Sequence, residues 1–194
     1  MASATTLMTT EELMAMPDDG VERWLINGEL RESRPRLGGP PMTIRNRFHS
    51  QVLVWLCHEL AKWLERQTEP CGRIVGGEAG VRLRQDPETT VGVDVAYLSA
   101  ELAARQTDDT SIVDGVPILI GEILSPSDTQ EDIHEKVKKY LEVGVRLVWV
   151  LNPYDRTVRV YRPGEPPQLF NEKQDLTGEP HLPGFCVRVE RLFR

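Results

Sequence analysis

Two carboxylates stand alone inside apolar stretches of this 194-residue sequence. Glu122 interrupts the apolar run that extends from Ile118 to Leu124. Asp94 interrupts the stretch VGVDVAYLS in the same way. Burying an ionised carboxylate without a partner costs roughly several kcal/mol, so each group must be protonated, paired or bound to a metal. Two such carboxylates can together hold a divalent metal beside a phosphodiester, where the metal polarises the phosphoryl group and lowers the pKa of an attacking water.

A lysine of the helix that follows Glu122 is the candidate for the positive charge that this reaction needs. The apolar face of that helix is marked by residues at helical spacing, Ile133, Val137, Tyr140 and Leu141. Lys136 lies at the edge of this face, so its stem can run along the core towards Glu122 and place an ammonium where negative charge develops. Lys138 and Lys139 fall further round the helix, where solvated lysines are expected. The alternative for Lys136 is a surface lysine paired with an acidic residue of its own helix.

A third carboxylate, Glu78, precedes Asp94 and sits among glycines in the stretch GRIVGGEAGVRLR. These glycines leave room for another group to approach the backbone closely. We therefore assign Glu78 as an accessory metal ligand, and a surface residue in an ion pair is the equally open alternative.

Residues 31–47 carry the most uneven charge of the chain. Five arginines stand against one carboxylate, Glu32, which gives this segment a net charge of +4 in a chain whose net charge is −7. Guanidinium groups match the geometry of phosphate oxygens. The residues that we assign to nucleic-acid binding are Arg34, Arg36, Arg45, Arg47 and the neighbouring His49. A solvated, flexible loop is the alternative for the segment, and a lone histidine on a helix is more often a surface or capping residue than a ligand.

The elements that must position these groups follow from capping and periodicity signals. Thr9 and Glu12 have capping-box spacing before a short helix that Pro17 stops, and Asn27-Gly28 predicts a two-residue hairpin turn. A long helix is predicted over residues 43–66, and a second helix starts with a capping box at Asp128 and ends near Gly144. Strands are predicted around residues 72–84, 91–99, 118–124, 146–153 and 155–163. We predict a polar loop up to residue 114 and assign no element to the tail.

This order of elements predicts an α/β domain with a central mixed β-sheet flanked by helices and an N-terminal β-hairpin. The length is sufficient for a proper core, and we expect residues 1–194 to form a single domain. The sequence contains neither an apolar stretch long enough to span a membrane nor a secretory leader, so we expect a cytoplasmic protein.

Charge and cysteine content exclude other classes of protein. The net charge of −7 argues against a protein that coats nucleic acid non-specifically. Cys57, Cys71 and Cys186 are odd in number and widely spaced, so the sequence supports neither a disulfide framework nor a zinc knuckle.

Several phrases together resemble a known family. They are GVDVAYLS, EILSPSD, EKVKKYLEVGVRLVWVLNP, TVRVYRP and LPGF, and the similarity extends from TTEELMAMPDDG to LPGF. The sequence resembles the Uma-type restriction endonucleases of the PD-(D/E)XK nuclease superfamily. This resemblance implies a restriction endonuclease-like fold and cleavage of DNA that depends on Mg²⁺ or Mn²⁺. Because double-strand cutters of this fold commonly act as symmetric dimers, it also implies a homodimer.

Three positions depart from the pattern of the superfamily. Val93 stands where a proline usually precedes the aspartate, and this matters little because the carboxylate is the ligand. Leu124 stands where the strand usually carries a lysine, and the family resemblance moves that lysine to Lys136. Trp24 stands where the hairpin often carries a glutamate, although Glu29 remains nearby. The resemblance implies Asp94, Glu122 and Lys136 as the catalytic residues.

A fold does not guarantee its chemistry, because buried carboxylates can also form a purely structural network. The alternative function is therefore a catalytically silent nuclease-like domain that binds nucleic acid or a protein partner.

Overall fold

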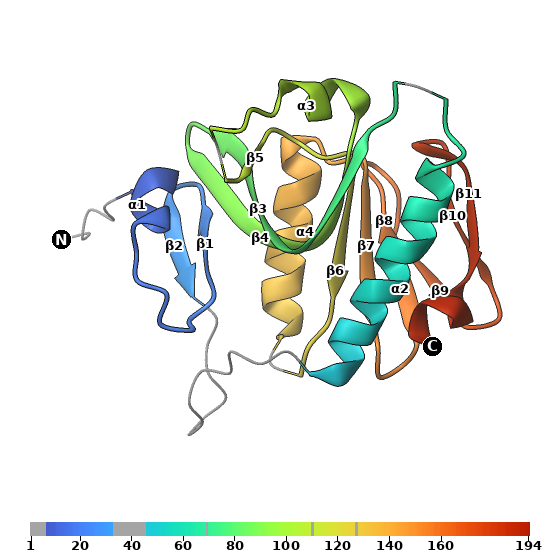
Figure 1. Ribbon diagram of the computed structural model, residues 1–194. Helices are drawn as coiled ribbons and strands as arrows, with labels where there is room; N and C mark the ends of the chain where they lie inside the picture. The colour runs from blue at the N-terminus through green and yellow to red at the C-terminus, as the bar shows by residue number, and fades with distance from the viewer. Residues whose placement is uncertain (1–6, 33–45, 69, 110, 127) are drawn as a thin grey trace.

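A mixed β-sheet forms the centre of the protein, with one long helix on each side of it. The computed structural model describes residues 7–32, 46–68, 70–109, 111–126 and 128–194. Helix α2 (Arg47–Leu64) covers one face of the sheet and helix α4 (Gln130–Val143) covers the other (Figure 1). The expected architecture, a mixed sheet flanked by helices with an N-terminal hairpin, is confirmed.

The sheet runs in the order β2-β1-β4-β6-β7-β8-β9, and β3 pairs with both β4 and β5. Its strands are β1 (Arg23–Ile26), β2 (Glu29–Glu32), β3 (Arg73–Gln85), β4 (Glu88–Leu98), β5 (Val113–Asp114), β6 (Leu119–Ile123), β7 (Leu147–Asn152), β8 (Thr157–Tyr161) and β9 (Gln168–Asn171). β6 is antiparallel to β4 and parallel to β7, and α4 forms the crossover between β6 and β7. The strands of a separate two-stranded sheet are β10 (Asp175–Gly178) and β11 (Leu182–Arg188).

The two faces of the sheet bury two apolar clusters. Alternate residues of a strand point to opposite faces, so Leu147 and Trp149 pack towards α2, whereas Val148 packs towards α4. β6 is buried along its whole length, as the sequence predicts. Gly121 lets α2 approach β6 closely, because a Cβ there would lie 3.1 Å from Leu56.

The N-terminal elements agree with the sequence signals. Thr9 and Glu12 form the expected capping box of α1 (Thr10–Met14). Asn27 and Gly28 have φ angles of 53° and 76°, as a two-residue hairpin turn requires, and join β1 directly to β2.

Two local predictions are wrong, and the tail contains elements for which no prediction was made. Helix α4 is capped by Thr129, whose side chain accepts from the backbone N–H of Asp132, and not by Asp128. The predicted loop before residue 114 contains a short helix, α3 (Ala100–Arg105), which Ser99 caps. The tail, to which no element was assigned, forms β9 to β11 and the 3-10 helix η1 (Val189–Phe193). Among the described residues, no helix has the length and apolar character needed to cross a membrane.

Candidate functional site

The candidate site lies where β4 and β6 separate. The ladder between these antiparallel strands extends from Tyr97 to Val95 on β4, and Val95 lies opposite Gly121. The next position brings Asp94 towards Glu122. β1 pairs with β4 at Thr90, so Asp94 lies between the part of β4 that pairs with β1 and the part that pairs with β6. The backbone ladder between β4 and β6 therefore ends beside Asp94, whose side chain is buried there together with that of Glu122.

Asp94 is held by two contacts that come from different elements. Its Oδ2 accepts a 2.7 Å hydrogen bond from the backbone N–H of Ile123, the residue after Glu122. The Asp94 carboxylate therefore gives the backbone N–H of Ile123 the acceptor that the backbone of β4 does not provide at this position. Its Oδ1 lies 3.0 Å from Nε2 of His49, which is in the first turn of α2 and only 3% exposed. One carboxylate therefore connects β4, β6 and α2.

Glu122 is buried between two side chains of α4 that are one helical turn apart. The Tyr140 hydroxyl donates a 2.6 Å hydrogen bond to Oε1, and Nζ of Lys136 lies 3.7 Å from Oε2. Desolvation by burial raises the pKa of Glu122 to about 7, because it outweighs the opposing charge of Lys136, and the negative charge of Asp94 adds to the rise. Burial and the charge of Glu122 also raise the pKa of Tyr140, which therefore stays protonated and donates. A cation placed here would stabilise the ionised form of Glu122.

Lys136 is oriented towards the carboxylates by its surroundings. Its side chain is 11% exposed, and Nζ lies 5.2 Å from the centre of the Trp24 ring, within the range of a cation–π contact. Burial alone would lower the pKa of Lys136, but Glu122 and Glu22 outweigh it, and the pKa is raised. The ammonium is therefore charged at neutral pH. Trp24 of β1 thus supports the lysine from the position where the superfamily often has a glutamate.

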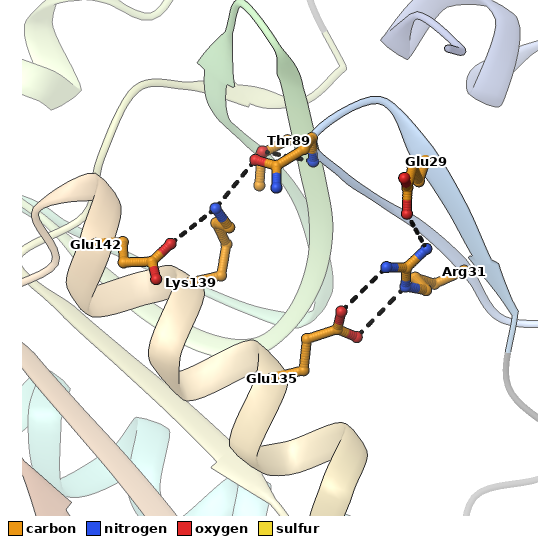
Figure 2. Close-up of polar contacts among 7 residues, drawn as sticks. Glu29, Arg31, Thr89, Glu135, Lys139 and Glu142 are labelled. Carbon is orange, nitrogen blue, oxygen red and sulfur yellow. Dashed lines mark hydrogen bonds and ion pairs between the residues drawn. The ribbon is translucent and has the colours of Figure 1, made fainter. Parts of the chain in front are cut away.

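The hairpin β1-β2 is tied to α4 by two polar connections (Figure 2). Nη2 of Arg31 lies 3.1 Å from Oε1 of Glu135, and Nη1 lies 2.9 Å from Glu29. One turn further along α4, Nζ of Lys139 donates to Oδ1 of Asn27 at 3.0 Å and to Glu142 at 2.9 Å. These contacts fix the helix face that carries Lys136.

The expectation that Lys139 is solvated is wrong. Its side chain is 9% exposed, because the hairpin turn packs over it, whereas the neighbouring Lys138 is 69% exposed. A helix considered alone predicts both lysines to be in solvent.

A cavity of about 430 Å³ lies beside Lys136. Glu22, Trp24 and Glu78 contribute to its wall together with Lys136, and Met14, Val21 and Ile112 make part of it apolar. Glu78 is exposed and has a φ of 63° at a bulge of β3, where the register with β4 shifts between Gly76 and Ala79. Bulges re-aim side chains next to active sites. Glu78 lines the same cavity as Lys136. Within the part of the chain that the structure describes, it belongs to no group of three His, Cys, Asp or Glu side chains that could hold a metal ion.

The donor set fits a hard divalent cation. Among the residues that the structure describes, no three His, Cys, Asp or Glu side chains come close enough to hold a metal ion by themselves. Mg²⁺ commonly needs less, since it binds through one or two carboxylates and keeps several waters or substrate phosphate oxygens. Asp94 and Glu122 would supply these carboxylates.

The structure brings together some of the assigned residues and separates others. Asp94, Glu122 and Lys136 meet, and His49 joins them as a buried partner of Asp94. Of the arginines assigned to nucleic-acid binding, Arg47 opens α2, and Arg34, Arg36 and Arg45 lie outside the described residues. Glu29 is engaged by Arg31 on the hairpin.

Two further residues of this site were missed in the sequence. Tyr140 was assigned to the apolar face of its helix, but its spacing of four from Lys136 could have shown that both reach the same carboxylate. Glu22 directly precedes β1 and lines the cavity beside Lys136 together with Trp24, and no pattern in the sequence singles it out.

The comparisons with known proteins identify the family and support the fold. The model of the family Uma2, described as "Putative restriction endonuclease", matches residues 10–190. The chain is also similar to the crystal structure of a putative nuclease belonging to DUF820 from Anabaena variabilis ATCC 29413. The TM-score is 0.75 at 16% sequence identity, over 96% of this chain and 97% of that one, so this likeness supports the fold. No match is found among curated proteins. The chain belongs to the Uma2 family of putative restriction endonucleases.

Proposed function

We propose that this protein is a metal-dependent endonuclease that hydrolyses phosphodiester bonds of DNA. The observation that carries the proposal is the buried group formed by Asp94, Glu122 and Lys136 at the point where β4 and β6 separate. Packing alone does not require two carboxylates and an ammonium in an otherwise apolar sheet, because replacing buried ion pairs by apolar groups is often neutral or stabilising.

Each residue of the candidate site has its own role in the proposed reaction. Asp94 and Glu122 would hold Mg²⁺ or Mn²⁺, which when bound polarises the phosphoryl group and lowers the pKa of an attacking water. Lys136 places an ammonium beside this position and stabilises the negative charge that develops on the phosphate. Tyr140 fixes Glu122 by donating to Oε1, and His49 fixes Asp94. Glu78 lines the cavity beside Lys136, and the role proposed for it is that of an accessory metal ligand.

Contact with the phosphate backbone is assigned to the arginine-rich segment. Of the four arginines assigned to this contact, Arg47 at the start of α2 is the described one, and His49 in the same helical turn reaches Asp94. We therefore propose that the DNA strand approaches the site over the N-terminal end of α2. A homodimer is the proposed assembly and is measurable by light scattering.

The test is an incubation of plasmid and single-stranded DNA with Mg²⁺ or Mn²⁺, using wild type and Glu122→Gln. The variant keeps the shape and the acceptor for Tyr140 but loses the charge, so we expect it to fold and not to cut. Glu131→Gln on the exposed start of α4 is the matched control and should cut as wild type does. Equal cleavage by Glu122→Gln would remove this residue from the site.

The alternative function, a silent nuclease-like domain, has one supporting observation. Asp94 and Glu122 already have protein partners in His49, Tyr140 and Lys136, so they could form a closed structural network. Calorimetric titration with Mg²⁺ and Mn²⁺ distinguishes the two functions. Binding that is lost in Asp94→Ala supports the enzyme, and no binding in the wild type supports the silent domain.

A further inference from the structure

An exposed aromatic pair lies beside the candidate site and has no role in the mechanism above. Phe48 in the first turn of α2 is 47% exposed, and Tyr154 in the turn between β7 and β8 is 50% exposed. Their rings meet edge to face, with centroids 6.1 Å apart. The guanidinium carbon of Arg47 lies 4.7 Å from the centre of the Phe48 ring. We call these three residues the aromatic platform.

The aromatic platform is continuous with the candidate site. Phe48 directly precedes His49, whose Nε2 contacts Asp94. Tyr154 follows β7, and β7 runs parallel to β6, so the carboxyl ends of both strands meet at one edge of the sheet, where Glu122 pairs with Val150. Figure 1 shows the start of α2, the end of β6 and the turn between β7 and β8 at the same end of the molecule.

The turn that presents Tyr154 is held in place by side-chain hydrogen bonds. Oδ1 of Asn152 accepts from the backbone N–H groups of Tyr154 and Asp155, at 2.9 and 3.2 Å. Nδ2 of Asn152 donates to Asp155 at 2.8 Å. The Tyr154 ring is therefore presented from a turn of defined shape, which lowers the entropy lost when it binds a partner.

We propose that the aromatic platform stacks an unpaired base of the substrate strand, and that the protein therefore acts on single-stranded DNA. Stacking needs exposed π-faces beside a cation that can meet the phosphate backbone, and Phe48, Tyr154 and Arg47 supply both. In a duplex, the bases are already stacked and paired and cannot reach such a surface. The inference rests on the proposed nuclease, since it names the class of strand that this site takes.

The experiment measures binding in EDTA, by fluorescence anisotropy, of three labelled probes. They are a single-stranded oligonucleotide, the same strand annealed to its complement, and a strand of the same length built from abasic residues. We expect wild type to bind the single strand most tightly. Phe48→Leu and Tyr154→Leu should each weaken binding of the base-containing single strand about five- to hundredfold and leave binding of the abasic strand unchanged. Tyr154→Phe keeps the ring and should bind as wild type does.

Val54→Ala is the matched control, because Val54 is an exposed apolar residue of the same helix at 65% exposure. The proposal is overturned if Phe48→Leu and Tyr154→Leu bind every probe like wild type, if they weaken the abasic strand equally, or if wild type binds no single strand. Failure of the nuclease proposal gives a different result. If the protein does not cut with Mg²⁺ but its binding depends on the bases, the aromatic-platform proposal stands and the nuclease proposal fails. If it cuts but binds strands with and without bases equally, the nuclease proposal stands and the aromatic-platform proposal fails.

Discussion

Helices α2 and α4 occupy equivalent places on opposite faces of the sheet but bury different kinds of side chain. The inward residues of α2 are mainly apolar, Val52, Leu56, Leu60 and Trp63. The inward side of α4 combines Val137 with Tyr140, Lys136 and Lys139. α2 is positioned mainly by apolar contact with the sheet, with His49 of its first turn paired to Asp94, whereas α4 is also tied to the hairpin by ion pairs and hydrogen bonds.

This difference shows how one sheet can serve stability and chemistry together. Apolar packing is non-directional, and its contribution to stability depends on the apolar area that is buried. It therefore suits the α2 face, which stabilises the fold. Charged groups need partners at defined distances, and they gather on the face where a second element, the hairpin, fixes the helix. Changes on the α4 face should therefore affect activity more than stability, and changes on the α2 face should do the reverse.

The largest expected effect comes from removing a charge at the carboxylate pair. Asp94→Asn keeps an oxygen that can accept from the backbone N–H of Ile123, so the fold should survive. Cleavage and Mg²⁺ binding should both be lost, because a neutral amide is a poor ligand for a hard cation. Plasmid cleavage, calorimetry and thermal unfolding of the same preparation check this. A variant that cuts normally would contradict the assignment of chemistry to this face.

The reverse test is made on the α2 face with Leu56→Ala. Leu56 is fully buried against the sheet, and such a truncation costs about 2–5 kcal/mol of unfolding free energy. Urea unfolding should show this loss, while the cleavage rate per folded molecule should stay near wild type. A selective loss of cleavage at unchanged stability would break the division between the two faces.

On the α4 face, Lys136→Met should lower the cleavage rate about a hundredfold with Mg²⁺ binding nearly intact. Methionine keeps the apolar stem against Trp24 but removes the ammonium beside Glu122. Lys138→Met is the matched control, because Lys138 is exposed on the same helix, and it should cut normally. Lys139→Met should chiefly lower stability, since Lys139 ties α4 to Asn27. A larger loss of cleavage in Lys139→Met would remove Lys136 from the site.

A smaller effect is expected from pH. The pKa of Glu122 is raised to about 7 by burial, and metal binding requires the ionised carboxylate. Protons therefore compete with the metal below pH 7, and Mg²⁺ affinity should rise with pH and level off above it. Calorimetry at pH 6 should show affinity about tenfold weaker than at pH 8. Affinity that stays flat over this range would show that Glu122 is either not a ligand or already ionised.

The sequence predicted the elements that have a strong local signal. The periodic helices, the Asn27-Gly28 hairpin and the buried strand with Glu122 all follow from spacing within a few residues. The short helix α3 was missed because six residues offer too little periodicity to distinguish a helix from a loop. The strands of the tail depend on packing against α2 and the sheet, which no local pattern shows.

For the candidate site, the sequence predicted Asp94, Glu122 and Lys136, which lie close together in the structure, but not what surrounds them. A single charged residue within an apolar run can be recognised from the sequence alone. The burial of Lys139 and the contact between Lys136 and Trp24 depend on the hairpin packing over α4, which the sequence of α4 does not contain. The pairing of His49 with Asp94 likewise depends on where the first turn of α2 meets β4.

The hydrogen bond from Ile123 to Asp94 also has an evolutionary consequence. Because the side-chain oxygen of Asp94 joins β6 to β4, folding by itself selects for an acceptor at this position. Under the proposed nuclease function, a descendant that lost cleavage would still be under pressure to keep aspartate or asparagine there, whereas Lys136 could be replaced by an apolar residue. In diverged copies of this protein, the residue at position 136 should therefore indicate retained activity better than the residue at position 94.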